Sequence, residues 1–531
     1  MGFLVAHQKG AGASWPSIAV GLFAAFGGIL YGYDTGTISG ILAMKYWLKE
    51  FSTGHVDSHG NPAITSDQES TIVSILSAGT FFGALASPLL SDRIGRRYAL
   101  CLVTWVFNLG VALQTAATAQ PMFIAGRFFA GLGVGLISAI IPLYQSETAP
   151  KWIRGLIVGS YQLAITIGLL LANVVNNATH KRDDSGSYRI PIAVQFAWSL
   201  ILFGGMLFLP ETPRFLVKQG KDDAAAKALS RLRRLDQDHQ EIRDELAEIR
   251  ANHEYEMSLR SESSTFDALK PPMLRRLLTG VGIQALQQLT GVNFIFYYGT
   301  KYFENSGMKN AFVISMITSS INVVSTFPGI WATDKFGRRP LLLAGAIGMA
   351  VSQLIVGLTG TLSTDQTNLG VTIVKNEAAQ RAGIAFICIY IFFFASTWGP
   401  LAWVVCSEIF PLRIRAFSVA TTTASNWLLN WAIAYSTPYL VNWGPGNANL
   451  QSKIFFIWFG ACFLCIAFVY FFVYETKNLT LEEVDELYAE VPHAWKSAGW
   501  KPTLRYADTK LPDPDKPEQQ GEHVEAAEKS V

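Results

Sequence analysis

An aspartate and an arginine stand out within long apolar runs in the first half of the chain. Asp34 lies in Gly32-Tyr33-Asp34-Thr35-Gly36 and Arg127 lies in a later run. A charged side chain is costly in a bilayer and usually marks function. At about 1.5 Å per helical residue, Asp34 would lie roughly 10 Å and Arg127 about 9 Å from the same membrane face. We therefore expect the two opposite charges to share a depth and to pair.

Such a pair can act as a proton switch. Burial in a low dielectric favours the neutral acid, whereas the guanidinium favours the carboxylate, so small movements of Arg127 would load or unload a proton at Asp34. Proton binding changes the conformation only if it favours one state over another. The alternative is an ion pair with a structural role alone.

A second group of residues offers hydrogen bonds without charge. Gln284, Gln287 and Gln288 have the spacing i, i+3 and i+4, so they share one face of a helix. Asn293 would face the opposite way on an ideal helix, but Gly291 permits a break that re-aims it. Broken helices of this kind line transporter binding sites. The alternative is that the amides only join neighbouring helices.

Other apolar runs also contain polar and aromatic side chains. They are Gln162, Asn322, Trp403, Asn426, Trp427 and Asn430. Amides and aromatic planes without a fixed charge suit a neutral polyhydroxylated solute, because hydroxyls both donate and accept hydrogen bonds and the C–H face of a ring packs on indole. Trp427 is the weaker candidate, because a tryptophan in a span more often packs or marks an interface.

Membrane-spanning helices must position these residues. Half of the 531 residues are hydrophobic and only 15% are charged, which is more apolar than a soluble core of this size requires. Twelve runs have about the 20 residues that cross a bilayer. They lie near residues 18–41, 67–90, 98–118, 121–145, 156–177, 191–209, 275–299, 310–332, 341–361, 382–405, 416–441 and 453–473.

Basic residues set the expected orientation. Arginines and lysines crowd the short loops after even-numbered runs and the segment 210–274. By the positive-inside rule these loops and both chain termini are cytoplasmic. No cleavable signal peptide is expected before the first span.

Several kinds of site are not expected. The cysteines all fall within the runs, and no histidines have metal-ligand spacing, so we expect neither a disulfide framework nor a metal site. No nucleophile, base and orienting group converge, so we expect no enzyme. We also expect a monomer in the lipid bilayer, with no nucleic-acid partner and no cofactor besides a co-transported proton.

Loop sequences from the first six runs recur after the second six. The matching segments are 91–97 with 333–339, 146–155 with 407–416, and 210–214 with 474–477. Duplicated six-span halves are typical of secondary transporters, which bind substrate near the bilayer midplane. Their acids and arginines can form ion pairs between helices that break when the halves move. The expected cytoplasmic network comprises Asp92, Arg96, Arg97, Glu147, Arg154, Asp334, Arg338, Arg339, Glu408 and Arg415.

We therefore predict an all-α membrane protein with twelve transmembrane helices in two six-helix halves and a cytoplasmic helical segment. Apolar residues at helical spacing within the charged linker predict amphipathic helices there. The predicted parts are a cytoplasmic tail 1–17, a first half 18–209, a cytoplasmic linker 210–272, a second half 273–473, and a cytoplasmic tail 474–531 that is largely disordered after about 490.

Together these residues resemble the sugar porter family of the major facilitator superfamily, and within it the fungal hexose transporters. The resemblance runs from about residue 17 to 490, and its most specific elements are 32–36, 127–131, 210–214, 287–293 and 474–477. It implies the major facilitator fold and alternating access to one central monosaccharide. The residues implied to hold the sugar are Gln162, Gln284, Gln287, Gln288, Asn293, Asn322, Trp403 and Asn426.

The resemblance also bears on gating and on the driving force. Tyr297 and Tyr298 would help to close the outer gate, and proton-coupled members carry an acid and an arginine where Asp34 and Arg127 stand. Two departures are Ala395, where some members have a glutamate, and the lack of the exterior cysteines that link a lid in plant relatives.

The implied activity is import of a hexose, with glucose expected first, across the plasma membrane. Facilitators also carry the acid at the position of Asp34, so its presence does not separate proton symport from facilitated diffusion. A sugar receptor that resembles a transporter is a third reading.

Overall fold

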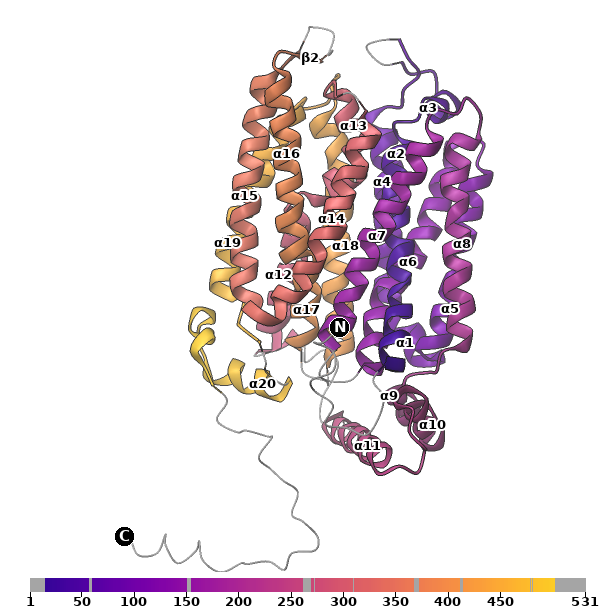
Figure 1. Cartoon of the computed structure of the whole chain (residues 1–531), viewed down its shortest axis with the longest axis vertical. Coiled ribbons are helices and arrows are strands. Elements are labelled where there is room, and N and C mark those ends of the chain that lie inside the picture. Colours follow the sequence, from indigo (N-terminus) through magenta and orange to yellow (C-terminus); the bar gives the residue numbers. More distant parts are fainter. Residues whose placement is uncertain are drawn as a thin grey trace, which may run out of the picture.

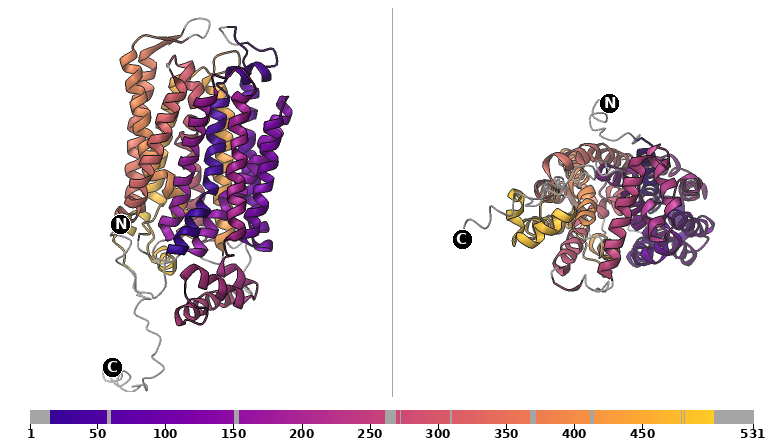
Figure 2. Two further views of the ribbon diagram at one scale, coloured as in Figure 1. Left: turned by 45° about the vertical axis from the view of Figure 1, so that its right-hand side comes forward. Right: turned by 90° about the horizontal axis from the view of Figure 1, so that it is seen from below.

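A computed structural model of the chain describes residues 15–56, 60–149, 154–260, 269–271, 273–308, 310–366, 372–410, 414–477, 479 and 481–501. Most of these residues lie in long helices that run side by side in two groups (Figure 1). The same two groups are seen next to each other when the molecule is viewed along the helices (Figure 2).

The first group contains the first half of the chain. Its long helices are α1 (Trp15–Ala25) with α2 (Gly27–Ile41), α4 (Ser66–Ile94), α5 (Arg96–Ala116), α6 (Gln120–Thr148), α7 (Arg154–Thr179) and α8 (Gly186–Phe208). The short helix α3 (Lys45–Phe51) lies at one end of this group.

The second group repeats this arrangement with more interruptions. Its helices are α12 (Met273–Leu289) with α13 (Val292–Asn305), α14 (Ala311–Phe336), α15 (Arg338–Ser363), α16 (Glu377–Phe393) with α17 (Gly399–Glu408), α18 (Arg415–Val441) and α19 (Ile454–Phe472). A π-helical turn, η3 (Phe394–Trp398), joins α16 to α17, and a 3₁₀ turn, η5 (Gln451–Lys453), precedes α19.

Two ends of the bundle can be distinguished. We call one the basic end, because it carries the repeated arginine loops. It also bears α9 (Pro213–Lys218), α10 (Asp222–Arg233), α11 (Gln240–Arg260), α20 (Leu481–Glu490) and the 3₁₀ turn η6 (Ala494–Gly499). We call the other the hairpin end, because it carries α3 and the antiparallel strands β1 (Thr364–Gln366) and β2 (Thr372–Val374).

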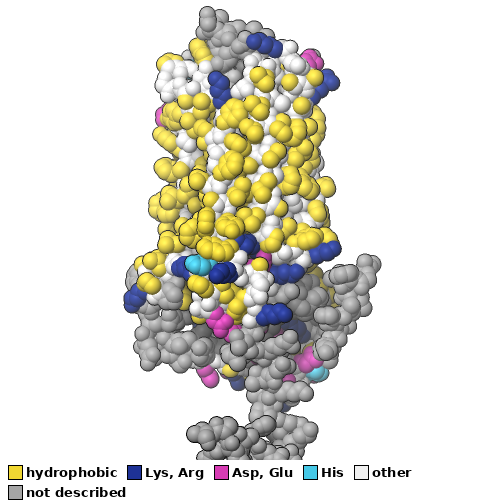
Figure 3. All heavy atoms as spheres, turned by 90° about the vertical axis from the view of Figure 1, so that its left-hand side faces the viewer, with side chains coloured by type: hydrophobic (Ala, Val, Ile, Leu, Met, Phe, Trp, Pro, Cys, Tyr) yellow, Lys and Arg dark blue, Asp and Glu magenta, His cyan; other side chains and the backbone are white. Residues whose placement is uncertain are grey.

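The bundle is a multi-pass membrane domain. Ten helices of the described chain are long and apolar enough to cross a membrane. On the face seen in Figure 3, hydrophobic side chains cover the middle of the bundle and charged side chains lie toward its ends. The α12–α13 pair and α18 are not among those ten helices, and both carry amides. With them the predicted arrangement of twelve spans in two halves is complete.

Glycines allow a close contact between two helices of the first half. Gly28, Gly32, Gly36 and Gly40 follow one another at four-residue intervals along α2 and face α7. A Cβ atom at Gly32 would lie 1.9 Å from the carbonyl oxygen of Ile165. Small residues at this spacing let two helix backbones approach closely in a membrane. This contact fixes the helix that carries Asp34.

We expect Gly32→Ala to destabilise the protein, because the added methyl group meets backbone that cannot rotate away. Overpacking of this kind costs about 1–3 kcal/mol of unfolding free energy, which should lower the thermal midpoint in detergent by several degrees. Gly204→Ala on α8 is the matched control, because no atom beyond its chain neighbours and its own helix backbone lies within 4 Å of the added Cβ. Equal midpoints for the two variants would contradict the packing argument.

Candidate functional site

Asp34 and Arg127 form an ion pair inside the first half. Arg127 Nη1 lies 3.1 Å from Asp34 Oδ2, and each side chain is 1% exposed. Arg127 Nε also donates to the carbonyl oxygen of Ile72 on α4 at 3.2 Å. The arginine therefore connects α2, α4 and α6, and the pairing expected from the shared depth of the two residues is confirmed.

The pair leaves polar atoms without partners. Within the described chain, Asp34 Oδ1 and Arg127 Nη2 are buried and make no hydrogen bond. Gln195 on α8 lies close enough to the Asp34 carboxylate to interact with it, but its amide atoms make no well-formed hydrogen bond in the described chain. Buried polar atoms without partners are costly. Asp34 Oδ1 is consequently an acceptor at which a proton can bind.

A cluster of amides fills the interior of the second half. Asn426 Nδ2 on α18 donates to Gln284 Oε1 at 2.7 Å and to Gln287 Oε1 at 2.8 Å. Gln288 Nε2 donates to Asn426 Oδ1 at 3.0 Å. The three glutamines thus point toward α18, as their shared helix face predicts. Gln284 Nε2 is buried and makes no well-formed hydrogen bond in the described chain. The Gln284 side chain lies near the Cys406 thiol, which is a weak partner that a ligand can replace.

The predicted helix break brings Asn293 into this cluster. Gly291 separates α12 from α13 with a φ of 83°, a conformation that favours glycine. After this break, Asn293 Nδ2 donates to Gln288 Oε1. Asn430 Nδ2 donates to the same oxygen at 3.2 Å. The break therefore changes the face on which Asn293 lies.

The cluster extends to the first half at two points. Ser77 Oγ on α4 donates to Asn430 Oδ1 at 2.6 Å. Gln287 Nε2 donates to the carbonyl oxygen of Gly399 at 3.1 Å, and a Cβ atom at Gly399 would lie 3.5 Å from Gln162 Nε2 on α7. The amides of the second half therefore reach Ser77 of the first half and approach the neighbourhood of its Gln162.

The remaining expected binding and gating residues lie around this cluster. Tyr297 OH donates to Asn430 Oδ1 at 3.2 Å, and Tyr298 OH donates to the carbonyl oxygen of Ala434 at 2.5 Å, so both tyrosines bind α18. Asn322 Oδ1 is buried without a partner in the described chain. Trp403 on α17 is partly exposed, and the structure records no hydrogen bond from its described side chain to the amides.

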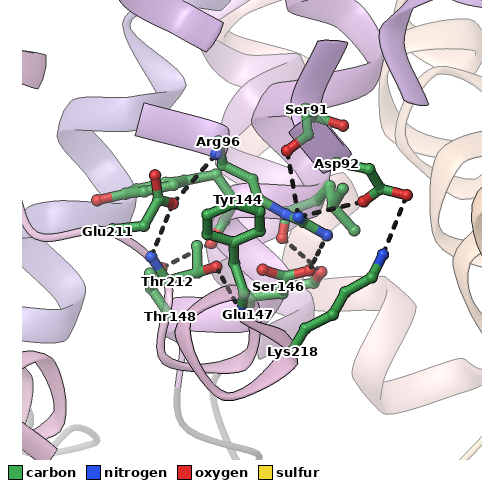
Figure 4. Close-up of polar contacts among 12 residues, drawn as sticks. Ser91, Asp92, Arg96, Tyr144, Ser146, Glu147, Thr148, Glu211, Thr212 and Lys218 are labelled. Carbon is green, nitrogen blue, oxygen red and sulfur yellow. Dashed lines mark hydrogen bonds and ion pairs between the residues drawn. The ribbon is translucent and has the colours of Figure 1, made fainter. Parts of the chain in front are cut away.

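The basic end of the first half holds the first copy of the arginine network (Figure 4). Arg96 Nη2 lies 3.1 Å from Glu147 Oε1, and Arg96 Nη1 lies 3.3 Å from Asp92 Oδ1. Lys218 Nζ on α9 lies 3.1 Å from Asp92 Oδ2. The Glu211 carboxylate accepts the backbone N–H of Arg96 at 3.1 Å. These contacts join α4, α5, α6 and α9 within one half.

The second half repeats the network with equivalent residues. Arg338 Nη2 lies 2.7 Å from Glu408 Oε1. Glu475 accepts the backbone N–H groups of Arg338 and Arg339 at 3.0 Å each. The side chains of the other three expected members, Arg154, Asp334 and Arg415, lie outside the described residues. The described ion pairs of the network therefore connect helices of the same half.

The second arginine of each loop binds a helix end instead of an acid. Arg97 Nε donates to the carbonyl oxygen of Met206 at 3.0 Å, and Arg339 Nη2 donates to that of Tyr470 at 3.0 Å. A cation at the carboxyl end of a helix also interacts favourably with the helix dipole.

Glu211 and Glu475 are central to the network but were not among its expected members. Their positions in the repeated segments 210–214 and 474–477 were the signal that could have identified them. Burial raises the pKa of the Glu211 carboxyl, and the N–H groups of Thr212, Arg97 and Arg96 that donate to it oppose this shift.

Comparison with known proteins identifies one family over most of the chain. The family model described as "Sugar (and other) transporter" matches residues 20–488. The major facilitator-type transporter ecdD of Aspergillus rugulosus is 66% identical, over 94% of this chain and 93% of that protein. The probable glucose transporter rco-3 of Neurospora crassa is 49% identical, over 94% of this chain and 83% of that protein.

A solved structure has the same fold. It is the proton:xylose symporter XylE bound to 6-bromo-6-deoxy-D-glucose, with a TM-score of 0.73 and 26% sequence identity. The match covers 90% of this chain and 100% of the other.

We expect Arg127→Met to destabilise the protein more than the double variant Asp34→Asn/Arg127→Met. The single change leaves a buried acid without its counter-charge, which typically costs about 3–5 kcal/mol, whereas removing both charges is often close to neutral. Thermal unfolding of purified protein in detergent measures the difference. Arg182→Met is the control, because it breaks an exposed pair with Asp184. A double variant no more stable than Arg127→Met would argue against an uncompensated charge.

Proposed function

We propose that this chain, which belongs to the sugar transporter family of the major facilitator superfamily, imports a hexose across the plasma membrane by alternating access and in symport with a proton. The observation that carries the proposal is the uncharged amide cluster between the two halves. It combines side chains of α7, α12, α13 and α18 with buried polar atoms that have no protein partner.

The cluster suits a neutral sugar. Its amides present both N–H donors and carbonyl acceptors, and a hydroxyl group can serve as partner to either. Gln284 Nε2 supplies a free donor and Asn322 Oδ1 supplies a free acceptor. An anionic substrate would instead require a cation, and the arginine of this region is held by Asp34. Glucose is the expected substrate, because rco-3 of Neurospora crassa is named a probable glucose transporter.

Proton coupling follows from the connection between the ion pair and the amides. Arg127 binds the Ile72 carbonyl on α4, and Ser77 on the same helix binds Asn430. A proton on Asp34 would remove the negative charge that holds Arg127 in place. Arg127 could then move, which would alter its hydrogen bond to α4. Symport is also supported by the fold of XylE, which is named a proton:xylose symporter.

The orientation follows from the distribution of basic residues. Helix α1, the first described segment, begins at the basic end. The last described turn, η6, also lies at this end, as do α9, α10 and α11. The positive-inside rule assigns this end to the cytoplasm, which makes both termini cytoplasmic and turns the hairpin end outward. We further propose that the chain functions as a monomer.

Gln287→Ala should weaken sugar binding, because it removes an amide that touches Asn426 and the Gly399 carbonyl. The half-maximal glucose concentration should rise at least about tenfold. Uptake of labelled glucose in cells that lack their own hexose transporters measures this value, and xylose, galactose and fructose as competitors rank the substrates. Gln219→Ala, which changes an exposed amide at the basic end, should leave uptake unchanged. Unaltered uptake by Gln287→Ala would place the sugar elsewhere.

Asp34→Asn should abolish concentrative uptake, because the amide cannot bind and release a proton, whereas exchange of labelled for unlabelled sugar should continue. In unbuffered cells, glucose should make the medium more alkaline with the natural chain but not with this variant, as a pH electrode can record. Uptake without alkalinisation by the natural chain would indicate facilitated diffusion. Binding without uptake would indicate a receptor.

A further inference from the structure

The hairpin end has its own charged contact between the halves, separate from the Asp34 pair. Lys301 Nζ on α13 lies 2.6 Å from Glu69 Oε2 on α4. Asn442 Nδ2, at the end of α18, donates to the same oxygen at 2.8 Å. The side chain of Glu69 is 1% exposed. Two helices of the second half therefore hold one buried carboxylate of the first half.

Further charges continue this contact across the boundary between the halves. Glu304 on α13 lies within electrostatic reach of Lys301 and of Lys45, which begins α3 in the first half. Each half thus contributes one acid and one lysine. The opposite charges attract when the two halves meet at the hairpin end and separate when they part.

The contact lies on a seam of hydrogen bonds between α4 and α18. Ser66 Oγ accepts from Asn442 Nδ2 at 3.2 Å. Asp67 Oδ1 accepts from Tyr439 OH at 3.0 Å, and Ser70 Oγ donates to the carbonyl oxygen of Tyr435 at 2.7 Å. The hairpin end is therefore closed by polar contacts along this seam, and a substrate can enter from that end only after the seam has opened.

We propose that the contact of Glu69 with Lys301 and Asn442, which we call the outer latch, stabilises the state in which the hairpin end is closed. In the transport cycle, this is the state from which the basic end opens. An unpaired charge is costly while it is buried. Opening the seam exposes Glu69 to water, so the carboxylate has partners in both the closed and the open state. Such a contact stabilises the closed state but does not prevent the hairpin end from opening again. The effect of the latch on sugar uptake rests on the proposed substrate, and labelling from outside the cell rests on the proposed orientation, whereas the contact between the halves rests on neither.

Loss of the latch should shift the protein toward the state that is open at the hairpin end, because only the closed state makes these contacts. With more carriers open outward, the external glucose concentration for half-maximal uptake should fall. The maximal rate should also fall, because closure around the sugar loses stabilisation. A purely structural role for Glu69 would lower the amount of folded carrier and leave the half-maximal concentration unchanged.

The direct test is the accessibility of a cysteine placed at a second contact between the halves, where α2 faces α13, because this contact opens when the halves part. Ser39 on α2 is 3% exposed and lies 3.1 Å from Thr300 Oγ1 of the second half, so Ser39→Cys reports opening without touching the latch. A membrane-impermeant maleimide is added to intact cells without sugar, and the chain without Ser39→Cys serves as the blank. Glu69→Gln and Lys301→Gln should each raise the labelling rate at least about fivefold.

Two further variants separate the latch from general destabilisation. The double variant Glu69→Gln/Lys301→Gln should raise labelling no more than the larger single change, because both changes remove one shared contact. Asn442→Ala keeps both charges and should give a smaller increase. Glu377→Gln is the matched control, because its exposed partner Arg381 lies on the same helix and in the same half. It should leave labelling unchanged.

Unchanged labelling in the latch variants, or an additive increase in the double variant, overturns the proposal. If labelling rises as expected but the natural chain does not take up glucose, the latch stands and the proposed substrate fails. If labelling does not rise but uptake is normal, the latch fails and the proposed function stands. The two inferences are therefore tested separately.

Discussion

A polar group inside a bilayer must find its partner within the protein, and this constraint shapes every part of the structure described above. Lipid offers neither hydrogen bonds nor counter-ions. Asp34 therefore holds Arg127, and Asn426 holds the glutamines of α12. Asp34 Oδ1 and Gln284 Nε2 are among the buried polar atoms of the described chain that lack a well-formed hydrogen bond, and they are the positions proposed above for a proton and a sugar hydroxyl.

Sequence periodicity predicted the spans well, because each span must be about 20 residues long and mostly apolar. It also predicted the break at Gly291 and the shared depth of Asp34 and Arg127, since both follow from the regular geometry of a single helix. Such features depend on local sequence and on the known rise per residue. They do not require knowledge of how the helices are arranged around one another.

Contacts between distant helices were harder to predict. Glu69 and Lys301 are 232 positions apart, and each lies near the end of a span, where a charge is ordinary. Nothing in either local sequence indicates the other. Gln162 and Gly399 likewise meet only because α7 and α17 pack across the boundary between the halves. Glu211 could be predicted in part. The sequence shows that it is repeated as Glu475, but it does not show that each carboxylate accepts backbone N–H groups.

Helix α4 connects the Asp34–Arg127 pair, the amide cluster and the hairpin end. Its Ile72 carbonyl accepts a hydrogen bond from Arg127, and its Ser77 donates one to Asn430. Its Glu69 binds Lys301 and Asn442 of the second half. When α4 separates from α18, the contacts of Ser77 and Glu69 must break, whereas that of Ile72 stays within the first half. The Asp34–Arg127 pair therefore stays with α4, and under the proposed function a sugar that orders Asn430 would act on the same helix that this pair contacts.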